Sequence, residues 1–267
     1  MASKRRFRTV IFTIVSANYI GFAATLMQSV RTFHPDAIRV IVLADSKRAF
    51  VDIDLAAELW SCDELGLARI DSMKVYYSVI EFNTALKPYA FSWLFEHFNA
   101  QSVIYIDPDI WLFSPMHEVL TGLKSHSIVL TPHVMVPLQD GKEPSDHTIM
   151  KSGIYNFGFF AARADTDAHR LLEWWADRCL AHCRVDIPGN LFTDQRWMDM
   201  APALVSKPLI LSGNPRLLIA SRHVPQLLHD PQKPWTFSLI FGSLLHIDSR
   251  LVTRIVCPRC APREEPI

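Results

Sequence analysis

Apolar and polar positions follow one another along this chain in blocks that predict strands connected by helices. Three apolar runs rich in β-branched residues, 10–15, 38–43 and 103–106, are typical of strands buried on both faces of a parallel sheet. Between the first two lies an amphipathic segment with helical spacing, which ends before His34-Pro35. This β-α-β order predicts an α/β protein with parallel strands flanked by helices.

The rest of the chain carries weaker patterns. Pro88 is expected in the first turn of a helix, and Thr193 is expected to cap the N-terminus of another. The other predicted elements are a helix with a connection at 52–67, helices at 82–98, 168–183 and 194–204, strands at 128–131 and 153–162, and a polar loop at 137–150. Because no repeat or clear linker interrupts the chain, residues 1–267 are predicted to form one domain, with an atypical tail at 205–267.

The N-terminus allows a second interpretation. The basic stretch 4–8 precedes a mostly apolar segment, 10–30, and this order resembles a signal anchor. Ser16, Asn18 and Thr25 interrupt the segment, whereas a membrane-spanning helix needs about 20 predominantly apolar residues. We therefore favour the β-α-β unit and expect no stable membrane span.

Composition narrows the class of protein further. Of the 267 residues, 49% are hydrophobic and 20% are charged, which fits a folded domain with a substantial core. The formal net charge of +0 provides no general attraction for nucleic acid, so no such partner is expected. Five cysteines in no disulfide-like pattern favour a reducing compartment; we expect a cytoplasmic protein and leave peripheral association with the inner membrane open. Cys257 and Cys260 have zinc-ribbon spacing but lack a second pair, so ordinary thiols are the simpler interpretation.

Two carboxylates, Asp107 and Asp109, come directly after the apolar run that ends at Ile106. In open α/β sheets, ligands bind at the carboxyl ends of the strands. Two carboxylates there repel each other unless a cation lies between them, and hard oxygen ligands suit Mg²⁺ or Mn²⁺. Such ions bind through one or two carboxylates together with substrate phosphates, which points to a nucleotide diphosphate. The alternative is a solvated Asp-Pro-Asp turn after a core strand.

Five short motifs, taken in order, resemble those of the GT-A glycosyltransferases, and most of all those of the retaining family-eight enzymes and their bacterial relatives. They are Ser16-Ala17-Asn18-Tyr19, Lys87-Pro88, Tyr105-Ile106-Asp107-Pro108-Asp109, Gly153-Ile154-Tyr155-Asn156-Phe157-Gly158-Phe159 and Thr193-Asp194-Gln195-Arg196-Trp197. Their order and spacing together carry the resemblance, which covers residues 8–204. It implies a GT-A, Rossmann-like α/β fold with a mixed, mostly parallel sheet flanked by helices. It also implies a metal-dependent enzyme that moves a hexose from a nucleotide diphosphate-sugar donor to a carbohydrate or glycoconjugate acceptor.

The resemblance also implies a role for each motif residue. Four residues at the first two strand ends would line the base and ribose of the donor: Ala17, Asn18, Tyr19 and Asp45. Lys87 would stand near the diphosphate, while Asp107 and Asp109 would hold Mn²⁺ or Mg²⁺ against both phosphates. The sugar side would be formed by Asn156, which contacts hydroxyls, by Gly158, which leaves room for the ring, and by Asp194 and Gln195, which reach the reacting carbon.

Several of these residues also have an ordinary structural interpretation. Asn156 could satisfy backbone groups in a turn, Asp194 could complement the dipole at a helix N-terminus, and Lys87 could be a solvated helix residue. Trp111 and Trp197, which lie beside the motifs, are the tryptophans that could stack on a sugar.

The C-terminal part departs from the family pattern. In families of this type a histidine near the C-terminus completes the metal site. His229 precedes Lys233-Pro234-Trp235 with compressed spacing and without the family's glycine, and His246 matches a shorter form of the pattern loosely. We favour His246 as the third metal ligand because it ends an apolar run, 237–245, that is typical of a strand.

Three functions stay open at this point. The first is the glycosyltransferase, with sugar, nucleotide and acceptor unspecified and retention implied only by the resemblance. The second is a module of the same fold that binds nucleotide or sugar without turnover, which the atypical tail favours. The third is a phosphatase of the haloacid dehalogenase type with Asp107 as nucleophile. It ranks last, because Trp111 stands where that class has Thr or Val and a long α/β pattern precedes the strand.

Overall fold

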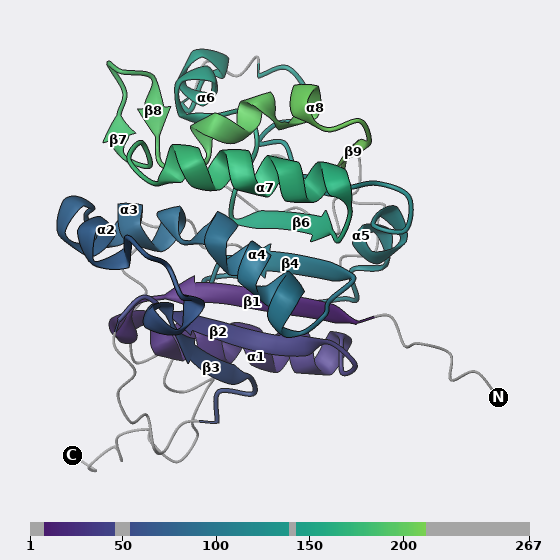
Figure 1. Ribbon diagram of the computed structural model, residues 1–267. Coiled ribbons are helices and arrows are strands. Elements are labelled where there is room, and N and C mark those ends of the chain that lie inside the picture. Colours follow the sequence, from purple (N-terminus) through teal and green to yellow (C-terminus); the bar gives the residue numbers. More distant parts are fainter. Residues whose placement is uncertain (1–7, 46–53, 139–142, 212–267) are drawn as a thin grey trace, which may run out of the picture.

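The protein is described by a computed structural model that covers residues 8–45, 54–138 and 143–211 (Figure 1). A sheet of seven strands forms its centre: β1 (Thr9–Val15), β2 (Ile38–Leu43), β3 (Glu58–Ser61), β4 (Ser102–Ile106), β5 (Ile128–Leu130), β6 (Phe159–Arg163) and β9 (Pro208–Ile210). The strand order is β3-β2-β1-β4-β6-β5-β9. β6 runs antiparallel to its neighbours β4 and β5, and the other pairs are parallel. This mixed, mostly parallel sheet confirms the predicted fold class.

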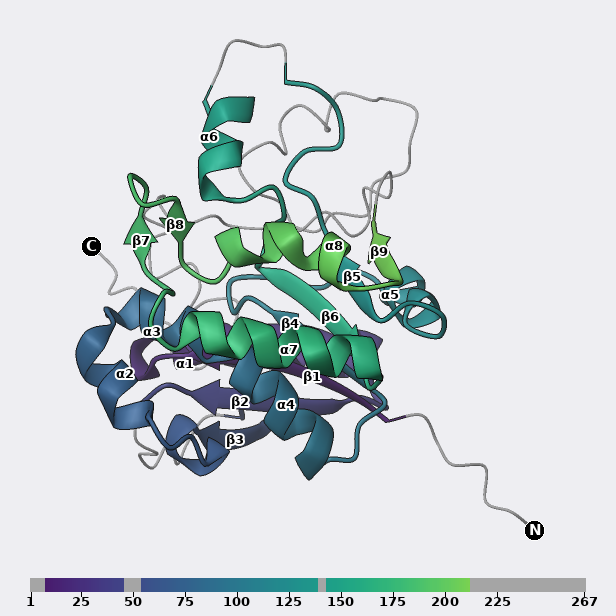
Figure 2. The same ribbon diagram turned by 45° about the horizontal axis from the view of Figure 1, so that its top comes forward.

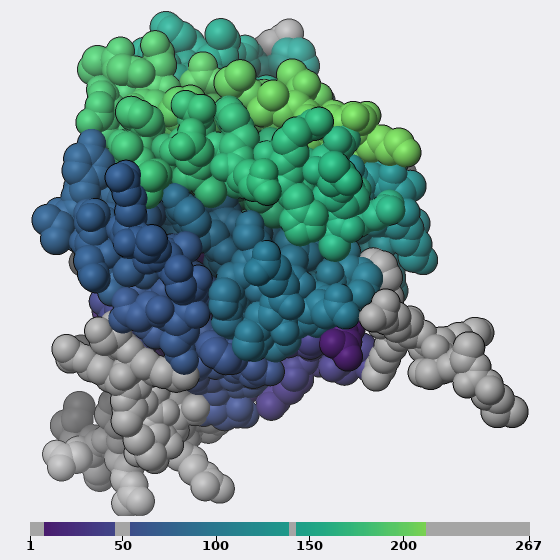
Figure 3. Space-filling model, in the orientation of Figure 1, coloured from purple at the N-terminus to yellow at the C-terminus, as the bar shows by residue number. Residues whose placement is uncertain are grey.

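Helices cover both faces of the sheet. On one face lie α4 (Lys87–His97) and α7 (Thr166–Cys179), and on the other lie α1 (Ile20–Phe33) and α5 (His117–Gly122). Figure 2 shows α7 in front of β4 and β6, and in the space-filling view the side chains of α4 and α7 adjoin over this face (Figure 3). Among the described residues, no helix has the length and apolar character that crossing a membrane requires.

Shorter elements complete the described residues. The helices are α2 (Ile70–Tyr76), α3 (Val79–Ala85), α6 (Asp146–Ser152) and α8 (Ala201–Leu204). The 3₁₀ helices are η1 (Ala17–Tyr19), η2 (Cys62–Leu65) and η3 (Arg196–Met200), and a separate hairpin is formed by β7 (Val185–Asp186) and β8 (Leu191–Phe192).

Strand β1 contributes side chains to the hydrophobic cores on both faces of the sheet. Val10, Phe12 and Ile14 belong to the core beneath α4 and α7, whereas Ile11 and Val15 belong to the core beneath α1. Side chains alternate between the two faces of a strand, so a continuous apolar run is needed where both faces are covered. The run at 10–15 therefore forms a central strand, as predicted.

One predicted element is wrong in part. The helix expected within 52–67 is absent from the described residues of that range, where strand β3 pairs with β2 and the 3₁₀ helix η2 follows. A capping box at Ser61 starts η2, and Gly66 ends it with φ of 69°. β3 is an edge strand and half-exposed, so its sequence lacks the apolar run that identified the central strands.

Other boundaries differ because local hydrogen bonds override the broad pattern. The helix expected at 82–98 is two helices, since a capping box at Ser78 starts α3 and the chain turns before α4, where Pro88 lies in the first turn as predicted. The loop expected at 137–150 contains the start of α6, which Ser145 caps. The strand expected at 153–162 begins only at Phe159.

The predicted helix at 194–204 is also corrected. It consists of η3 and the short helix α8, and Thr193 is not its N-cap. Thr193 has a positive φ of 48°, whereas an N-cap residue has extended backbone angles.

Candidate functional site

The predicted site residues that the structure describes gather at one edge of the sheet. β1, β2 and β4 are parallel and end at this edge, and β6 begins there because it runs in the opposite direction. η1 follows β1, Asp45 follows β2, Asp107 follows β4, and Gly158 precedes β6. The arrow of β1 points to this edge, at the left of Figure 1. The topology therefore brings together motifs that are far apart in the sequence.

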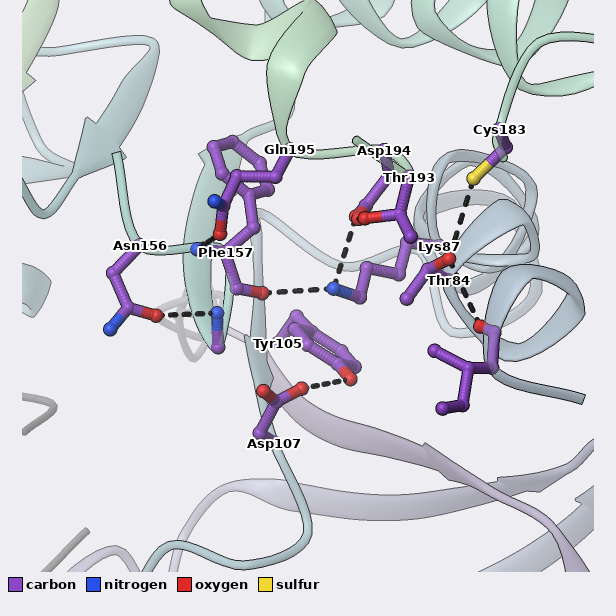
Figure 4. A network of polar contacts seen from close by, with 12 residues as sticks. Thr84, Lys87, Tyr105, Asp107, Asn156, Phe157, Cys183, Thr193, Asp194 and Gln195 are labelled. Carbon is purple, nitrogen blue, oxygen red and sulfur yellow. Dashed lines mark hydrogen bonds and ion pairs between the residues drawn. The ribbon is translucent and has the colours of Figure 1, made fainter. Parts of the chain in front are cut away.

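Asp107 is held by one hydrogen bond to its carboxylate and by another from its backbone. Its Oδ1 accepts a hydrogen bond from the Tyr105 hydroxyl at 2.5 Å (Figure 4), and its backbone N–H donates to the Gly158 carbonyl oxygen at 2.8 Å. A Cβ atom added at Gly158 would lie 2.8 Å from Oδ2 of Asp107, closer than real Cβ atoms approach. Glycine at this position thus leaves the space that the carboxylate needs. Room for a sugar ring at Gly158 stays a prediction.

Asp109 lies near Asp107 and is partly buried. Burial and the negative charge of Asp107 together raise the pKa of Asp109 to about 7. A carboxylate with a raised pKa gains from a positive charge placed beside it. Two carboxylates at a strand end with this electrostatic character are a suitable place for a divalent cation.

Lys87 is buried inside the protein. Its side chain is 3% exposed, and its Nζ lies 3.0 Å from Oδ2 of Asp194 in an ion pair. Nζ also donates to the Phe157 carbonyl oxygen at 2.9 Å and lies 4.5 Å from the centroid of the Tyr105 ring (Figure 4). Burial alone would lower the pKa of Lys87, but Asp194 and Asp107 outweigh it and raise the pKa, so the ammonium stays charged. Lys87 is therefore not a solvated helix residue.

Asp194 is the buried counter-charge of Lys87. Burial raises the pKa of the Asp194 carboxyl, and the Lys87 ammonium opposes that rise. The Thr193 hydroxyl donates to Oδ1 of Asp194 at 3.2 Å. The nearest helix, η3, begins only at Arg196, so this carboxylate is paired with a lysine rather than placed in a helix first turn. Contact of Asp194 with a donor sugar stays a prediction.

Gln195 and Asn156 hold the segment that leads into β6. Gln195 Oε1 accepts from the Phe157 N–H at 3.3 Å, and its Nε2 donates to the Ser152 carbonyl oxygen at 2.9 Å. Asn156 Oδ1 accepts from the Gly158 N–H at 2.9 Å. Asn156 therefore satisfies a backbone group in a turn, which confirms the structural alternative given for it above. The roles of both amides toward a sugar stay predictions.

A cavity of about 290 Å³ lies beside the ends of β1 and β2. Its lining residues are Ser16, Ala44, Asp45, Lys74, Tyr77, Val79 and Phe82. Asp45 Oδ2 accepts a hydrogen bond from the Ala17 N–H at 2.6 Å, so two residues predicted to bind the nucleoside are in direct contact. Asn18 and Tyr19 are exposed next to them.

Tyr105 and Phe157 are site residues to which the sequence analysis assigned no role. The signal for Tyr105 was present, because residues two apart in a strand face the same side and Tyr105 precedes Asp107 by two. Phe157 contributes its backbone carbonyl oxygen, which no pattern of side chains reveals.

The carboxylates of Asp107 and Asp109 are ligands of the kind that Mg²⁺ or Mn²⁺ takes, and binding of such an ion stays a prediction. Oδ2 of Asp107 has no hydrogen-bond partner among the described residues, and carboxylate oxygens are the ligands that these ions prefer. Within the same residues, no group of three or more His, Cys, Asp or Glu side chains could hold a metal. The predicted third ligand, His246, and its competitor His229 lie outside the described residues, as do Cys257 and Cys260.

Comparison with known proteins gives few sequence matches and many structural ones. No family model matches the chain. A segment of 100 residues is 31% identical to YfnF of Bacillus subtilis (strain 168), which is described as uncharacterized; the match spans 37% of this chain and only 33% of that protein.

The similar solved structures include three glycosyltransferases. The galactosyltransferase LgtC, in complex with donor and acceptor sugar analogs, is 13% identical over 75% of this chain and 72% of its own, with a TM-score of 0.44. The bifunctional WbbM is 13% identical over 79% of this chain and 40% of its own, with a TM-score of 0.47. GlyE of Streptococcus pneumoniae TIGR4 is 15% identical over 77% and 45%, with a TM-score of 0.44.

Proposed function

We propose that this protein is a metal-dependent glycosyltransferase that moves a sugar from a nucleotide diphosphate-sugar to a carbohydrate or glycoconjugate acceptor. One observation carries the proposal. Asp107 and Asp109 end the central strand β4 at the same sheet edge as the cavity beside Asp45. A carboxylate pair that can hold a cation beside a cavity that can hold a nucleoside is the arrangement that a nucleotide diphosphate requires.

Each group of residues has a task in this proposal. Ala17, Asn18, Tyr19 and Asp45 bind the nucleoside, and Asp107 and Asp109 hold Mn²⁺ or Mg²⁺. When bound, the ion neutralises the charge that grows on the departing nucleoside diphosphate. Lys87 acts from below the surface, because its ammonium is already paired with Asp194 and is more suited to organising the site than to touching a phosphate.

Asn156, Asp194 and Gln195 form the sugar side of the proposed site. Gln195 and Asn156 are fixed by hydrogen bonds to the segment 156–158, next to Asp107. In this position their amides would orient the donor sugar. Retention of configuration is expected only because the motifs resemble those of retaining enzymes. Asp194 reaches the sugar only if its ion pair with Lys87 adjusts, because its side chain is 2% exposed.

The test is release of nucleoside diphosphate from a panel of nucleotide sugars with Mn²⁺, by transfer or by slow hydrolysis. Asp109→Ala should abolish release and leave the circular dichroism spectrum unchanged, because a carboxylate at a strand end does not pack the core. Asp177→Ala is the matched control, since this carboxylate on α7 is 66% exposed and its loss should leave the rate unchanged. Undiminished release by the wild type in EDTA would rule out the metal role.

The same assay separates the two alternatives. A binding module would be stabilised against heat by a nucleoside diphosphate with Mn²⁺, yet would release none from any donor. A phosphatase would hydrolyse simple phosphomonoesters and form a covalent aspartyl-phosphate on Asp107.

A further inference from the structure

We propose that Tyr105 is a positioning residue of the metal site, whose hydroxyl holds the Asp107 carboxylate so that Oδ2 is left for the ion. The inference rests on the proposed function, because it takes Asp107 as a ligand of a divalent cation. It assigns a task to a buried hydroxyl that the proposed reaction itself does not use.

The first step is the contact between the two side chains. Tyr105 and Asp107 stand two positions apart at the end of β4 and therefore face the same side. The 2.5 Å separation between the Tyr105 hydroxyl and Oδ1 is in the range of a charge-assisted O–H···O⁻ hydrogen bond. Such a bond engages one of the two carboxylate oxygens and restrains rotation of the group.

The second step is that the phenol cannot turn away. Tyr105 is 3% exposed, and its ring meets the Phe12 ring edge to face at a centroid distance of 5.2 Å. The Tyr105 ring is also in contact with Lys87, whose Nζ lies 4.5 Å from the ring centroid and forms an ion pair with Asp194 (Figure 4). The hydroxyl is therefore preorganised by packing, whether or not a ligand is bound.

The other carboxylate oxygen of Asp107, Oδ2, lies beside Gly158. The Asp107 N–H bonds to the Gly158 carbonyl oxygen, and Oδ2 lies where a Cβ atom at position 158 would collide with it. The carboxylate is thus held by the protein at Oδ1, while Oδ2 lies beside the open space at Gly158 and is available. Carboxylates that ligate metals depend on such outer partners, and loss of a partner typically weakens metal binding by about 10- to 100-fold.

The experiment is a Mn²⁺ titration of Tyr105→Phe, which deletes the hydroxyl and keeps the ring. Free Mn²⁺ is followed by electron paramagnetic resonance, first with the protein alone and then with a nucleoside diphosphate added. We expect the Mn²⁺ affinity to fall by about tenfold or more, in line with the loss of an outer partner. The matched control is Tyr89→Phe, whose hydroxyl donates to the Ala176 carbonyl oxygen at 2.7 Å and does not touch Asp107. It should bind Mn²⁺ as the wild type does.

A spectroscopic readout keeps the test decisive even if Tyr105→Phe does not fold. Mn²⁺ bound to Asp107 should perturb the near-ultraviolet absorbance of the hydrogen-bonded phenol, in the wild type and in Tyr89→Phe alike. Absence of a tyrosine signal in both proteins on saturation with Mn²⁺ would overturn the inference.

The outcomes also distinguish this inference from the proposed function. Wild-type Mn²⁺ affinity in folded Tyr105→Phe, or equal losses in Tyr105→Phe and Tyr89→Phe, would overturn the role of Tyr105 and leave the glycosyltransferase standing. No Mn²⁺ binding by the wild type, with or without nucleoside diphosphate, would overturn both the inference and the proposed metal dependence.

Discussion

Asp194 and Asp107 lie in neighbouring parts of the site, and their negative charges are balanced in different ways. Asp194 is buried and has its counter-charge, Lys87, at 3.0 Å inside the protein. Asp107 is only partly buried, accepts one hydrogen bond from Tyr105, and has no cationic side chain in an ion pair with it among the described residues. A buried charge must be paired within the fold, whereas a charge at the surface can take its partner from a ligand.

This difference assigns a distinct task to each region. The Lys87–Asp194 ion pair stabilises the buried part of the site, whereas the partly buried carboxylates of Asp107 and Asp109 are the proposed ligands of a cation. The two regions are nevertheless joined, because the Lys87 ammonium lies over the Tyr105 ring and Tyr105 bonds to Asp107. Substitutions in the Lys87–Asp194 pair should therefore weaken cation binding at Asp107 and Asp109, whereas substitutions at Asp107 or Asp109 should leave the buried ion pair intact.

The largest effect is expected from Lys87→Met, which leaves Asp194 buried without its counter-charge. We expect the free energy of unfolding to fall by about 3–5 kcal/mol, the typical loss when one partner of a buried pair is removed. Lys74→Met makes the same change in the Lys74–Asp63 pair, whose side chains are 30% and 45% exposed, and should cost about 0–1 kcal/mol. Urea unfolding followed by circular dichroism measures both. Equal losses would mean that the buried pair is no more important than a surface pair.

An effect of opposite sign is expected from Asp109→Asn in EDTA. The pKa of Asp109 is raised from 3.8 to about 7, so the folded state holds a proton that the unfolded state releases near pH 4. The free energy of unfolding of the wild type should therefore fall between pH 4 and pH 7, by at most about 4 kcal/mol at 1.36 kcal/mol per pKa unit.

Asparagine does not titrate, so above pH 7 the Asp109→Asn variant should be the more stable of the two metal-free proteins. Saturating Mn²⁺ should reverse this order, since only the wild type keeps both carboxylates. The measurement is urea unfolding across this pH range with EDTA and with Mn²⁺. Parallel stability curves for the two proteins in EDTA would contradict the electrostatic account of Asp109.

The smallest effect is expected from Gly158→Ala, which tests the fit around Asp107. The new Cβ would lie 2.8 Å from Asp107 Oδ2 and 3.0 Å from Asn156 Oδ1, so the carboxylate must shift. We expect the Mn²⁺ affinity to fall about tenfold, or about 1.4 kcal/mol, with the fold retained.

Gly21→Ala is the control for Gly158→Ala. It adds a Cβ in the first turn of helix α1, where it meets no atom of another part of the protein within 4 Å. It should raise the free energy of unfolding by less than about 1 kcal/mol without changing Mn²⁺ binding. If Gly158→Ala binds Mn²⁺ as tightly as Gly21→Ala does, Asp107 does not need the space that Gly158 leaves.

The central strands could be predicted from local sequence patterns, whereas the edge strand depends on pairing with a distant segment. The runs at 10–15, 38–43 and 103–106 became central strands because continuous apolar character is required wherever both faces of a sheet are covered. The half-exposed edge strand β3 has no such requirement, and its mixed, polar sequence predicts a helix and a connection instead. Its identity depends on pairing with β2, which is a contact between distant residues.

The site likewise has features that follow from local sequence and features that follow from tertiary packing. The sequence by itself determined that Asp107 and Asp109 end a buried parallel strand, because periodicity and β-branching are local properties, and strand ends are where ligands bind in such sheets. Only the tertiary structure decided that Lys87 is buried against Asp194 and that the Tyr105 hydroxyl donates a hydrogen bond to one oxygen of Asp107. A charged side chain is driven to pair inside a protein only where packing removes water, and that packing exists only once α4, α7 and β4 have come together.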